Sequence, residues 1–340
     1  MEDAATPTEP LRAGVAGVGW WGGELARGAR ASGSVELVSC FSPTEANRTR
    51  FADQHGLRGA PSWDDFIGDD EIEAVFVATP HSTHVSLVEE AIGAGKHVFV
   101  DKPLTLSVEE GLQCVEAAEE AGLVLQVGHN RRRQDATRHI RRLIEEGVLG
   151  TVVMADTNMS GPTGLRGDSL NWRSDPGERP LSGMTPYGVH LVDTLHYLIG
   201  PISAVTAMRG NTLSKTRLDD AAVLLLQFAG GAVGMLGTST SVPTTNRIGV
   251  LGSAGSAWNY DDGARLLVQG IDDKAPAPRP VEKIDTVAEE VTDFAISVRT
   301  GRSPEVGGRE GLAVVGVLEA ALESAGTGKT VEVRRETRQG

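Results

Sequence analysis

Short apolar runs alternate with amphipathic segments along the first 128 residues of the chain. The runs are rich in β-branched side chains and read RAGVAGV, VELVSCF, EAVFVAT, HVFVD and LVLQVG. Apolar runs separated by helical segments are typical of buried strands in a parallel sheet that has helices on both sides. The pattern therefore predicts a doubly wound α/β domain over residues 11–133.

A different pattern follows this first domain. The predicted elements are helices over 134–146, 186–199, 285–300 and 308–325 and a strand over 151–158. Six further runs, ISAVTAM, AAVLLLQF, AVGMLGTST, RIGVLG, AWNY and ARLLVQG, have strand character and are joined by short turns. We expect a second α/β domain over residues 134–340, with an open and largely antiparallel sheet.

A long stretch rich in glycine, proline and serine, Gly161–Gly183, interrupts the second domain. Structureless loops of this length are uncommon inside a compact protein unless they cover or line a site. We therefore expect this loop to take part in function.

Three glycines, Gly17, Gly19 and Gly22, form a GxGxxG pattern directly after the first predicted strand. Glycines at these places permit a tight turn and a close approach of the backbone to a pyrophosphate, while the next helix directs its first N–H groups at the phosphates. The position predicts a Rossmann dinucleotide site. We include Trp20 and Trp21 among the residues expected to bind the cofactor, although tryptophans at such positions are more often packing residues.

The end of the second strand predicts which nicotinamide cofactor is used. An NAD site usually has an Asp or Glu there, which binds the ribose 2′-hydroxyl. This chain has Ser42 instead, followed by Thr44 and Arg48, which could hold a 2′-phosphate. The sequence favours NADP and leaves NAD open.

Lys102 ends a strand at the carboxyl edge of the predicted sheet, between Asp101 and Pro103. Doubly wound proteins bind their ligands at this edge, so a lysine there can face the nicotinamide. A solvated lysine beside a turn proline is the alternative interpretation.

The helix predicted to begin near Pro186 carries two further candidates. At about 100° per residue, His190 and Asp193 lie on a face away from the leucines, which places both on the non-core side. His196 falls near the apolar arc and is expected to be structural. His190 alone could equally be an ordinary surface histidine.

Together these motifs resemble the glucose–fructose oxidoreductase/inositol dehydrogenase family, also called Gfo/Idh/MocA. The matching stretches are GVAGVGWWG, ATPHSTHVSLVEEAIGAGKHVFVDKP, VGHNRR, NWRSDP and GVHLVD. The resemblance implies a Rossmann domain, a C-terminal α/β domain whose open sheet makes oligomer contacts, and hydride exchange between NAD or NADP and a sugar-like or polyol hydroxyl. A homodimer or homotetramer is expected.

The same resemblance assigns residues. Lys102 and His190 match the family's lysine and histidine, and the other matches, expected to line the cofactor, are Thr79, Pro80, His84, Asp101, Asn130, Trp172 and Arg173. Many inositol dehydrogenases have an Asp four residues before the histidine, where this chain has Pro186. The full triad is therefore not carried over, and Asp193 is expected to orient the imidazole of His190 instead.

Composition narrows the class of partner. The formal net charge of −14 repels nucleic acid and anionic lipid and favours a small molecule. No apolar run approaches the roughly 20 residues of a membrane span, and the N-terminal MEDAATPTEPLR differs from a signal peptide, so a disordered tail over residues 1–10 and a cytoplasmic location are expected. Cys40 and Cys114 lack metal-ligand spacing, and no metal site is predicted.

The resulting hypothesis is an NAD(P)-dependent dehydrogenase in which His190 exchanges the alcohol proton and Lys102 stabilises the oxygen. Four alternatives stay open. They are a dehydrogenase of a dihydrodiol carboxylic acid, redox-assisted elimination at a glycoside, reduction of an imine or enone, and a cofactor-sensing regulator without catalysis. The arginines between Arg131 and Arg142 are expected on a solvated helix face, or else against a substrate carboxylate.

Overall fold

The computed structural model describes residues 9–165, 172–181, 183–213 and 218–334. The chain divides into two compact units, the first made of Met1–Asn130 with Asp285–Leu312 and the second of Arg131–Ile284 with Ala313–Gly340. The predicted boundary was residue 133, whereas this division falls between residues 130 and 131, and residues 285–312, predicted in the second domain, belong to the first unit. The predicted tail over residues 1–10 lies mostly outside the described residues.

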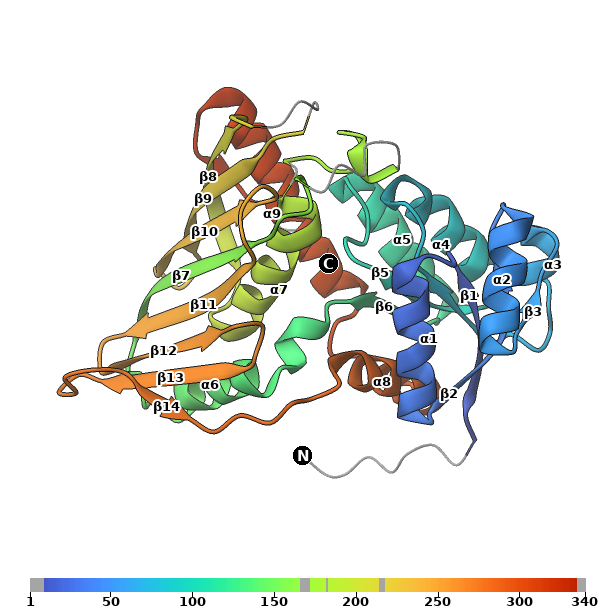
Figure 1. The fold of residues 1–340 in the computed structure, drawn as a ribbon, viewed down its shortest axis with the longest axis horizontal. Helices are drawn as coiled ribbons and strands as arrows, with labels where there is room; N and C mark the ends of the chain where they lie inside the picture. Colours follow the sequence, from blue (N-terminus) through green and yellow to red (C-terminus); the bar gives the residue numbers. More distant parts are fainter. Residues whose placement is uncertain (1–8, 166–171, 182, 214–217, 335–340) are drawn as a thin grey trace. The chain divides into compact units, whose positions relative to one another are not determined.

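The first unit is built on a six-stranded parallel sheet in the order β3-β2-β1-β4-β5-β6 (Figure 1). Its strands are β1 (Leu11–Ala16), β2 (Val35–Phe41), β3 (Arg58–Gly59), β4 (Ala74–Val77), β5 (His97–Asp101) and β6 (Leu125–Gly128). Its helical elements are α1 (Trp20–Ser32), α2 (Glu45–His55), α3 (Trp63–Ile67), η1 (His81–Thr83), α4 (His84–Gly93), α5 (Val108–Ala121) and α8 (Thr286–Thr300). The predicted doubly wound sheet is confirmed.

Helix α8 completes the core of this unit although it comes late in the chain. Phe294 packs edge-on against Phe76 and Phe99, with ring centroids 5.5 and 5.8 Å apart. At the crossing with α1, a Cβ on Gly28 would lie 2.6 Å from Val287. The amphipathic pattern of this helix predicts a buried face but does not tell which sheet will cover it, and this explains the incorrect domain assignment.

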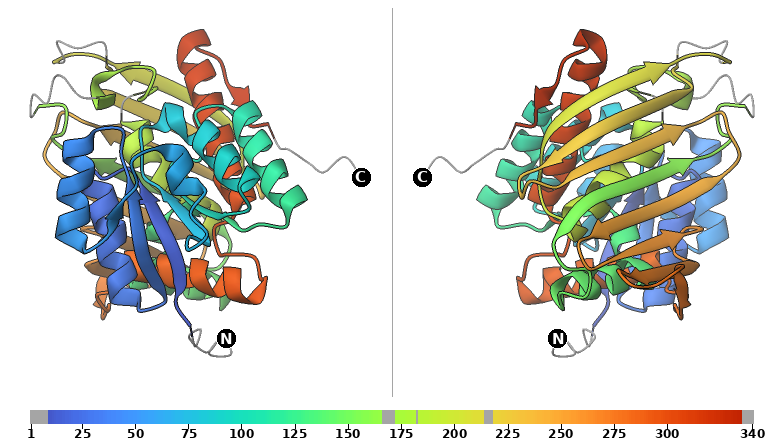
Figure 2. Two further views of the ribbon diagram at one scale, coloured as in Figure 1. Left: turned by 90° about the vertical axis from the view of Figure 1, so that its right-hand side faces the viewer. Right: turned by 90° about the vertical axis from the view of Figure 1, so that its left-hand side faces the viewer.

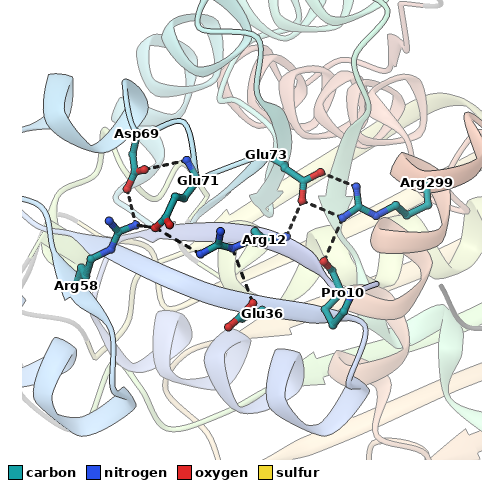
Figure 3. Close-up of polar contacts among 8 residues, drawn as sticks. All are labelled: Pro10, Arg12, Glu36, Arg58, Asp69, Glu71, Glu73 and Arg299. Carbon is teal, nitrogen blue, oxygen red and sulfur yellow. Dashed lines mark hydrogen bonds and ion pairs between the residues drawn. The ribbon is translucent and has the colours of Figure 1, made fainter. Parts of the chain in front are cut away.

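A network of ion pairs joins α8 to the amino-terminal ends of the strands (Figure 3). The guanidinium of Arg299 donates to both carboxylate oxygens of Glu73, at 2.5 and 2.9 Å, and to the carbonyl of Pro10. Glu73 in turn accepts from the backbone N–H of Arg12 at 2.9 Å. The opposite, carboxyl edge of the sheet carries the predicted cofactor residues.

The second unit is built on a nine-stranded sheet in the order β14-β13-β12-β11-β7-β10-β9-β8-β15. Its strands are β7 (Val152–Ser160), β8 (Ile202–Gly210), β9 (Ala221–Phe228), β10 (Val233–Ser239), β11 (Thr245–Gly252), β12 (Gly255–Tyr260), β13 (Arg265–Gly270), β14 (Ala277–Arg279) and β15 (Val331–Glu332). Seven of its pairings are antiparallel, and β10 runs parallel to β7. The largely antiparallel sheet is therefore as predicted.

Helices cover one face of this sheet. They are α6 (Asp135–Glu145), α7 (Val189–Leu198) and the greater part of α9 (Gly308–Thr327), with the short helical turns η2 (Asn130–Arg133), η3 (Trp172–Ser174) and η4 (Met184–Gly188) nearby in the chain. The right-hand view of Figure 2 looks onto the other face, where the strands lie open. Burial alternates along β9 and β10, because every second side chain points to the open face.

In the described part of the loop over residues 161–183, the backbone forms turns and the helical turn η3, with no strand or α-helix. No helix in the described ranges of the chain is long and apolar enough to cross a membrane.

Candidate functional site

The turn between β1 and α1 has the geometry of a phosphate cradle. Gly17 has φ +97°, and a Cβ there would lie 2.3 Å from the carbonyl oxygen of Ala78. A Cβ on Gly22 would lie 2.0 Å from the carbonyl oxygen of Gly17, so neither place accepts a side chain. A Cβ on Gly19, in contrast, would have no described atom within 4 Å. Gly19 also begins α1 without a side-chain cap, which leaves its first N–H groups available for phosphate oxygens.

The two tryptophans of this turn differ in burial. Trp20 is 73% exposed, while Trp21 is partly buried and packs against the core of the first unit. Their ring centroids are 5.5 Å apart. Trp20 is therefore an exposed indole at the cradle, and Trp21 is a packing residue, as such tryptophans more often are.

The turn after β2 carries a cation in place of a carboxylate. Ser42 is buried, and Arg48 donates to its carbonyl oxygen at 2.7 Å. Arg48 lies on α2, which begins after Thr44 without a side-chain cap. A positive charge is thus held beside the position that is acidic in sites selective for NAD.

His84 connects the strand ends on either side of Lys102. Its Nδ1 lies 3.0 Å from the Pro103 carbonyl oxygen and 3.2 Å from that of Leu104, and its Nε2 lies 3.2 Å from that of Thr79. Burial lowers the pKa of this imidazole, so it is neutral. His84 is fully buried and contacts backbone, and therefore holds together the two loops that carry Thr79, Pro80 and Lys102.

Asp101, Lys102 and Asn130 come from neighbouring strand ends. Asp101 is in register with Gly128, the last residue of β6, and Lys102 joins Pro103 by a cis peptide bond. Asn130 donates from Nδ2 to Thr286 at 2.9 Å, while its buried Oδ1 has no hydrogen-bond partner within the described ranges. An amide oxygen of this kind can accept from a ligand at the carboxyl edge of the sheet.

His190 and Asp193 lie on α7 in the second unit, and both are buried, with exposed fractions of 6% and 1%. The expectation that they lie on the non-core side was wrong. On the face of α7 away from the leucines, Asp193 pairs with Arg132 of the same unit, and neither His190 nor Asp193 is exposed to water. The predicted helix start at Pro186 corresponds to the turn η4, after which α7 begins at Val189.

Asp193 belongs to a buried ion pair with Arg132. Arg132 donates from Nε to Oδ2 at 3.1 Å and from Nη2 to Oδ1 at 2.5 Å, and its guanidinium lies over the ring of Tyr197. The proposed help of Asp193 to His190 stays a prediction. Burial lowers the pKa of His196 to about 4, and its structural role stays a prediction.

The arginines after residue 130 do not form a uniform solvated face. Arg132 and Arg133 are buried, whereas Arg131 binds Asp262 at 3.1 Å and Arg141 binds Glu145 at 2.6 Å. The expectation of a solvated cluster was therefore wrong for two of its members, Arg132 and Arg133, because both are buried.

The loop before α7 holds one arginine that the sequence patterns missed. Arg173, in η3, stacks on Trp172 with 4.3 Å between its guanidinium carbon and the ring centroid. Arg179 donates from Nη1 to the backbone carbonyl of Arg173 at 3.3 Å and is buried. No motif marks Arg179, and a buried arginine in a loop rich in turns leaves no periodic signal. Asn171, the first residue of the NWRSDP motif, lies outside the described residues.

Among the described residues, no group of three or more His, Cys, Asp or Glu side chains could hold a metal ion.

The predicted site residues are divided between the two units. The first unit brings together the glycine turn, Ser42, Arg48, Thr79, Pro80, Lys102 and Asn130 along one sheet edge, and the second unit carries His190, Asp193, Trp172 and Arg173.

Several curated relatives match this chain. A D-xylose 1-dehydrogenase (NADP(+)) from Haloarcula marismortui is 27% identical and covers 98% of this chain and 96% of its own length. A levoglucosan dehydrogenase from Pseudarthrobacter phenanthrenivorans is 26% identical over 80% of this chain and 82% of its own length. An uncharacterized oxidoreductase from Streptococcus pneumoniae is 28% identical, but the match spans about half of that relative, 54% of its length.

Solved structures share the fold. An oxidoreductase from Desulfitobacterium hafniense superposes with a TM-score of 0.92 at 25% identity, over 96% of this chain and 99% of that one. Levoglucosan dehydrogenase in complex with NADH and levoglucosan superposes with a TM-score of 0.89 at 23% identity, over 96% and 100%.

Two family models cover most of the chain. The model described as "Oxidoreductase family, NAD-binding Rossmann fold" matches residues 11–129, and the "GFO/IDH/MocA C-terminal domain" matches residues 137–258. The first match ends and the second begins on either side of the division between the two units. The chain therefore belongs to the Gfo/Idh/MocA family of NAD(P)-dependent oxidoreductases.

Proposed function

We propose that this protein exchanges a hydride between NAD or NADP and a secondary alcohol of a sugar or polyol. The observation that carries the proposal is the first unit's sheet edge, where the glycine cradle and Lys102 lie at the ends of β1 and β5. The names of the relatives that act on D-xylose and levoglucosan support a sugar-like substrate.

Each candidate side chain has a distinct task. The cofactor, when bound, accepts or gives the hydride at its nicotinamide ring. His190 takes the hydroxyl proton during oxidation and returns it during reduction, as a histidine can near neutral pH. Lys102 donates a hydrogen bond to the same oxygen and stabilises its developing negative charge. His84 keeps the Lys102 loop in place through its contacts with the Pro103 and Leu104 carbonyls.

Comparison of four variants tests these tasks. Lys102→Met and His190→Asn should lower kcat about 10²- to 10⁴-fold with D-xylose, levoglucosan or an inositol, while the Kd of the cofactor changes little. Lys274→Met, at an exposed position, and His139→Asn, on α6, are matched controls that should retain activity. Loss of cofactor affinity without a change in rate would contradict the assignment.

The alternative functions give different results in the same assay. A cofactor-sensing regulator would bind NADPH or NADH but would turn over no polyol. Redox-assisted elimination would form product without a net change in nicotinamide absorbance, because the hydride returns to the product.

We also propose that NADP is the preferred cofactor. Arg48 is held at Ser42 by its bond to the Ser42 carbonyl, so a cation is available for a 2′-phosphate. Fluorescence of Trp20, an exposed indole at the cradle, gives a direct titration signal for both NADPH and NADH.

We propose further that two or more copies assemble through the open face of the second unit's sheet. Met208, Val223, Leu225, Val233 and Met235 are exposed there, and they lie on the adjacent strands β8, β9 and β10. An apolar surface of this kind on neighbouring strands is typical of an interface. Leu225→Glu should shift the mass measured by light scattering to that of a monomer, whereas Glu332→Lys on β15 should not. An unchanged mass in Leu225→Glu would contradict this interface.

A further inference from the structure

Arg179 is a buried cation whose charge the described chain does not balance. It is 9% exposed, and the single hydrogen bond of its side chain among the described residues runs from Nη1 to the Arg173 carbonyl at 3.3 Å. Its Nε and Nη2 are buried and have no hydrogen-bond partner there. Burial lowers the pKa of Arg179; the nearby Tyr187 raises it and the charge of Arg173 lowers it further. A buried charge without a counter-ion is costly, so it is kept where a ligand supplies one.

The two donors of Arg179 without partners form a matched pair. Nε and Nη2 lie on the same edge of a guanidinium and point in nearly parallel directions, which fits the two oxygens of a carboxylate. Arg132 binds Asp193 through this same pair of atoms, at 3.1 and 2.5 Å. Arg309 binds Glu119 in the same way, at 2.8 and 2.7 Å. Of the arginines in the described ranges, Arg179 alone has both of these atoms buried without a hydrogen bond.

The surroundings of Arg179 connect it to the helix that carries His190. The next residue, Pro180, accepts a hydrogen bond at its carbonyl from Thr185 at 3.0 Å, in the turn η4 that leads into α7. Tyr187, in the same turn, hydrogen-bonds Thr163 at 3.3 Å and is near enough to affect the pKa of Arg179. Arg179 thus belongs to the packed segment that positions the start of α7.

We propose that Arg179 binds an oxyanion carried by the substrate, and that the substrate is therefore an acidic sugar or polyol. A carboxylate fits the paired donors best, and the phosphate of a sugar phosphate presents the same oxygen chemistry. The proposal rests on the proposed function, because it names the substrate class of that same site. Arg131, Arg132 and Arg141, which the sequence offered for a substrate carboxylate, bind carboxylates of their own chain.

The first test needs no ligand. Arg179→Met removes an unbalanced buried charge, so its midpoint of thermal unfolding should equal or exceed that of the wild type. Arg132→Met, the matched control, leaves Asp193 without its partner and should unfold several degrees lower. A midpoint for Arg179→Met as low as that of Arg132→Met would show that Arg179 is structural, and would overturn the proposal.

The second test compares sugars that differ in one group. D-Glucose, D-glucuronate and D-glucose 6-phosphate, and D-galactose with D-galacturonate, are titrated by calorimetry in the presence of cofactor. We expect an acidic member to bind more tightly than its neutral counterpart. Arg179→Gln should weaken the acidic ligand about 10- to 100-fold and leave the neutral one unchanged. Arg209→Gln, at an exposed arginine of the same unit, should bind both as the wild type does.

The possible results distinguish a carboxylate from a phosphate as the bound anion. They also distinguish failure of the oxyanion site from failure of the proposed dehydrogenase activity. Tighter binding of the uronates identifies a carboxylate site, and tighter binding of the sugar phosphate identifies a phosphate site. A lower affinity for NADPH in Arg179→Gln, with sugar binding unchanged, would assign the arginine to the cofactor and overturn the proposal, as would failure of every acid to bind. Turnover of neutral sugars that is independent of Arg179 would overturn this inference and leave the dehydrogenase intact. Binding of an acid through Arg179 without turnover of any sugar would refute the dehydrogenase and leave the oxyanion site.

Discussion

Both carboxylate oxygens of Asp193 accept hydrogen bonds from the guanidinium of Arg132, inside the second unit. The two side chains are 1% and 7% exposed, so neither charge can be solvated in place of its partner. Asp193 is thus first of all one half of a buried ion pair.

Removal of either half of this pair should destabilise the protein. Asp193→Asn and Arg132→Met each leave one buried charge without its partner, and each should lower the free energy of unfolding by about 3–5 kcal/mol. The double variant Asp193→Leu/Arg132→Met should recover much of that loss, since no charge then remains. Urea denaturation followed by circular dichroism measures all three. An Asp193→Asn protein with normal stability and no activity would instead favour a catalytic task alone.

The glycine cradle predicts opposite outcomes for neighbouring substitutions. Gly19→Ala places a methyl group in open space at φ −80°, so the variant should fold normally but bind NADPH at least about tenfold more weakly, because the methyl group occupies the approach to the phosphates. Gly22→Ala forces a Cβ against the Gly17 carbonyl at 2.0 Å and should lower the melting temperature as well. Tryptophan fluorescence and thermal unfolding distinguish the two. Unchanged cofactor affinity in Gly19→Ala would show that phosphates do not bind at this turn.

Cofactor choice should respond to the charge at the end of β2. Ser42→Asp introduces the carboxylate that binds a ribose 2′-hydroxyl and repels a 2′-phosphate, so the Kd of NADPH should rise about tenfold or more relative to that of NADH. Ser42→Asn is the control, because asparagine is neutral and similar in size to aspartate. Equal effects on NADPH and NADH would mean that Ser42 does not lie near the 2′ position.

Two histidines with lowered pKa values, His84 and His196, should make the protein sensitive to mild acid. The pKa of His196 is lowered to about 4 by burial, and burial also lowers the pKa of His84. Because their pKa is lower in the folded state than the unfolded value of about 6.5, their neutral forms stabilise the fold above that pH, and stability is lost as pH falls from about 6.5 towards 4.

A single substitution measures how much His196 contributes to this loss of stability in acid. His196→Phe should reduce the loss of unfolding free energy between pH 7 and pH 4, by up to about 3 kcal/mol. Equal slopes in the wild type and His196→Phe would place the proton uptake on other groups.

The sequence predicted the elements whose signal is local. The alternation of buried strands and helices, the GxGxxG turn and the paired-strand pattern after residue 200 each lie within a short window, and each was confirmed. The domain of α8 was assigned incorrectly because amphipathicity marks a buried face without naming its partner, here Phe76 and Phe99.

The site was less accessible to sequence reasoning for the same physical cause. Arg132 and Asp193 are 61 residues apart, and no spacing rule connects them. His190 was expected on the non-core side of its helix, but a helical wheel shows which residues share a face and not what covers that face. Arg179 lies in a loop, where burial follows from tertiary packing and leaves no period in the sequence.

The return of Asp285–Leu312 to the first unit has a consequence for synthesis of the chain. While the ribosome adds residues 131–284, all strands of the nucleotide-binding sheet have already been synthesised. Phe76 and Phe99 of that sheet then still lack the contact with Phe294, which has not yet been made. Exposed apolar surface of this kind makes a nascent chain prone to aggregation. The first unit therefore cannot finish folding until residues 285–312 have been made, and a fragment ending at Asn130 should need a chaperone or the missing helix supplied as a peptide.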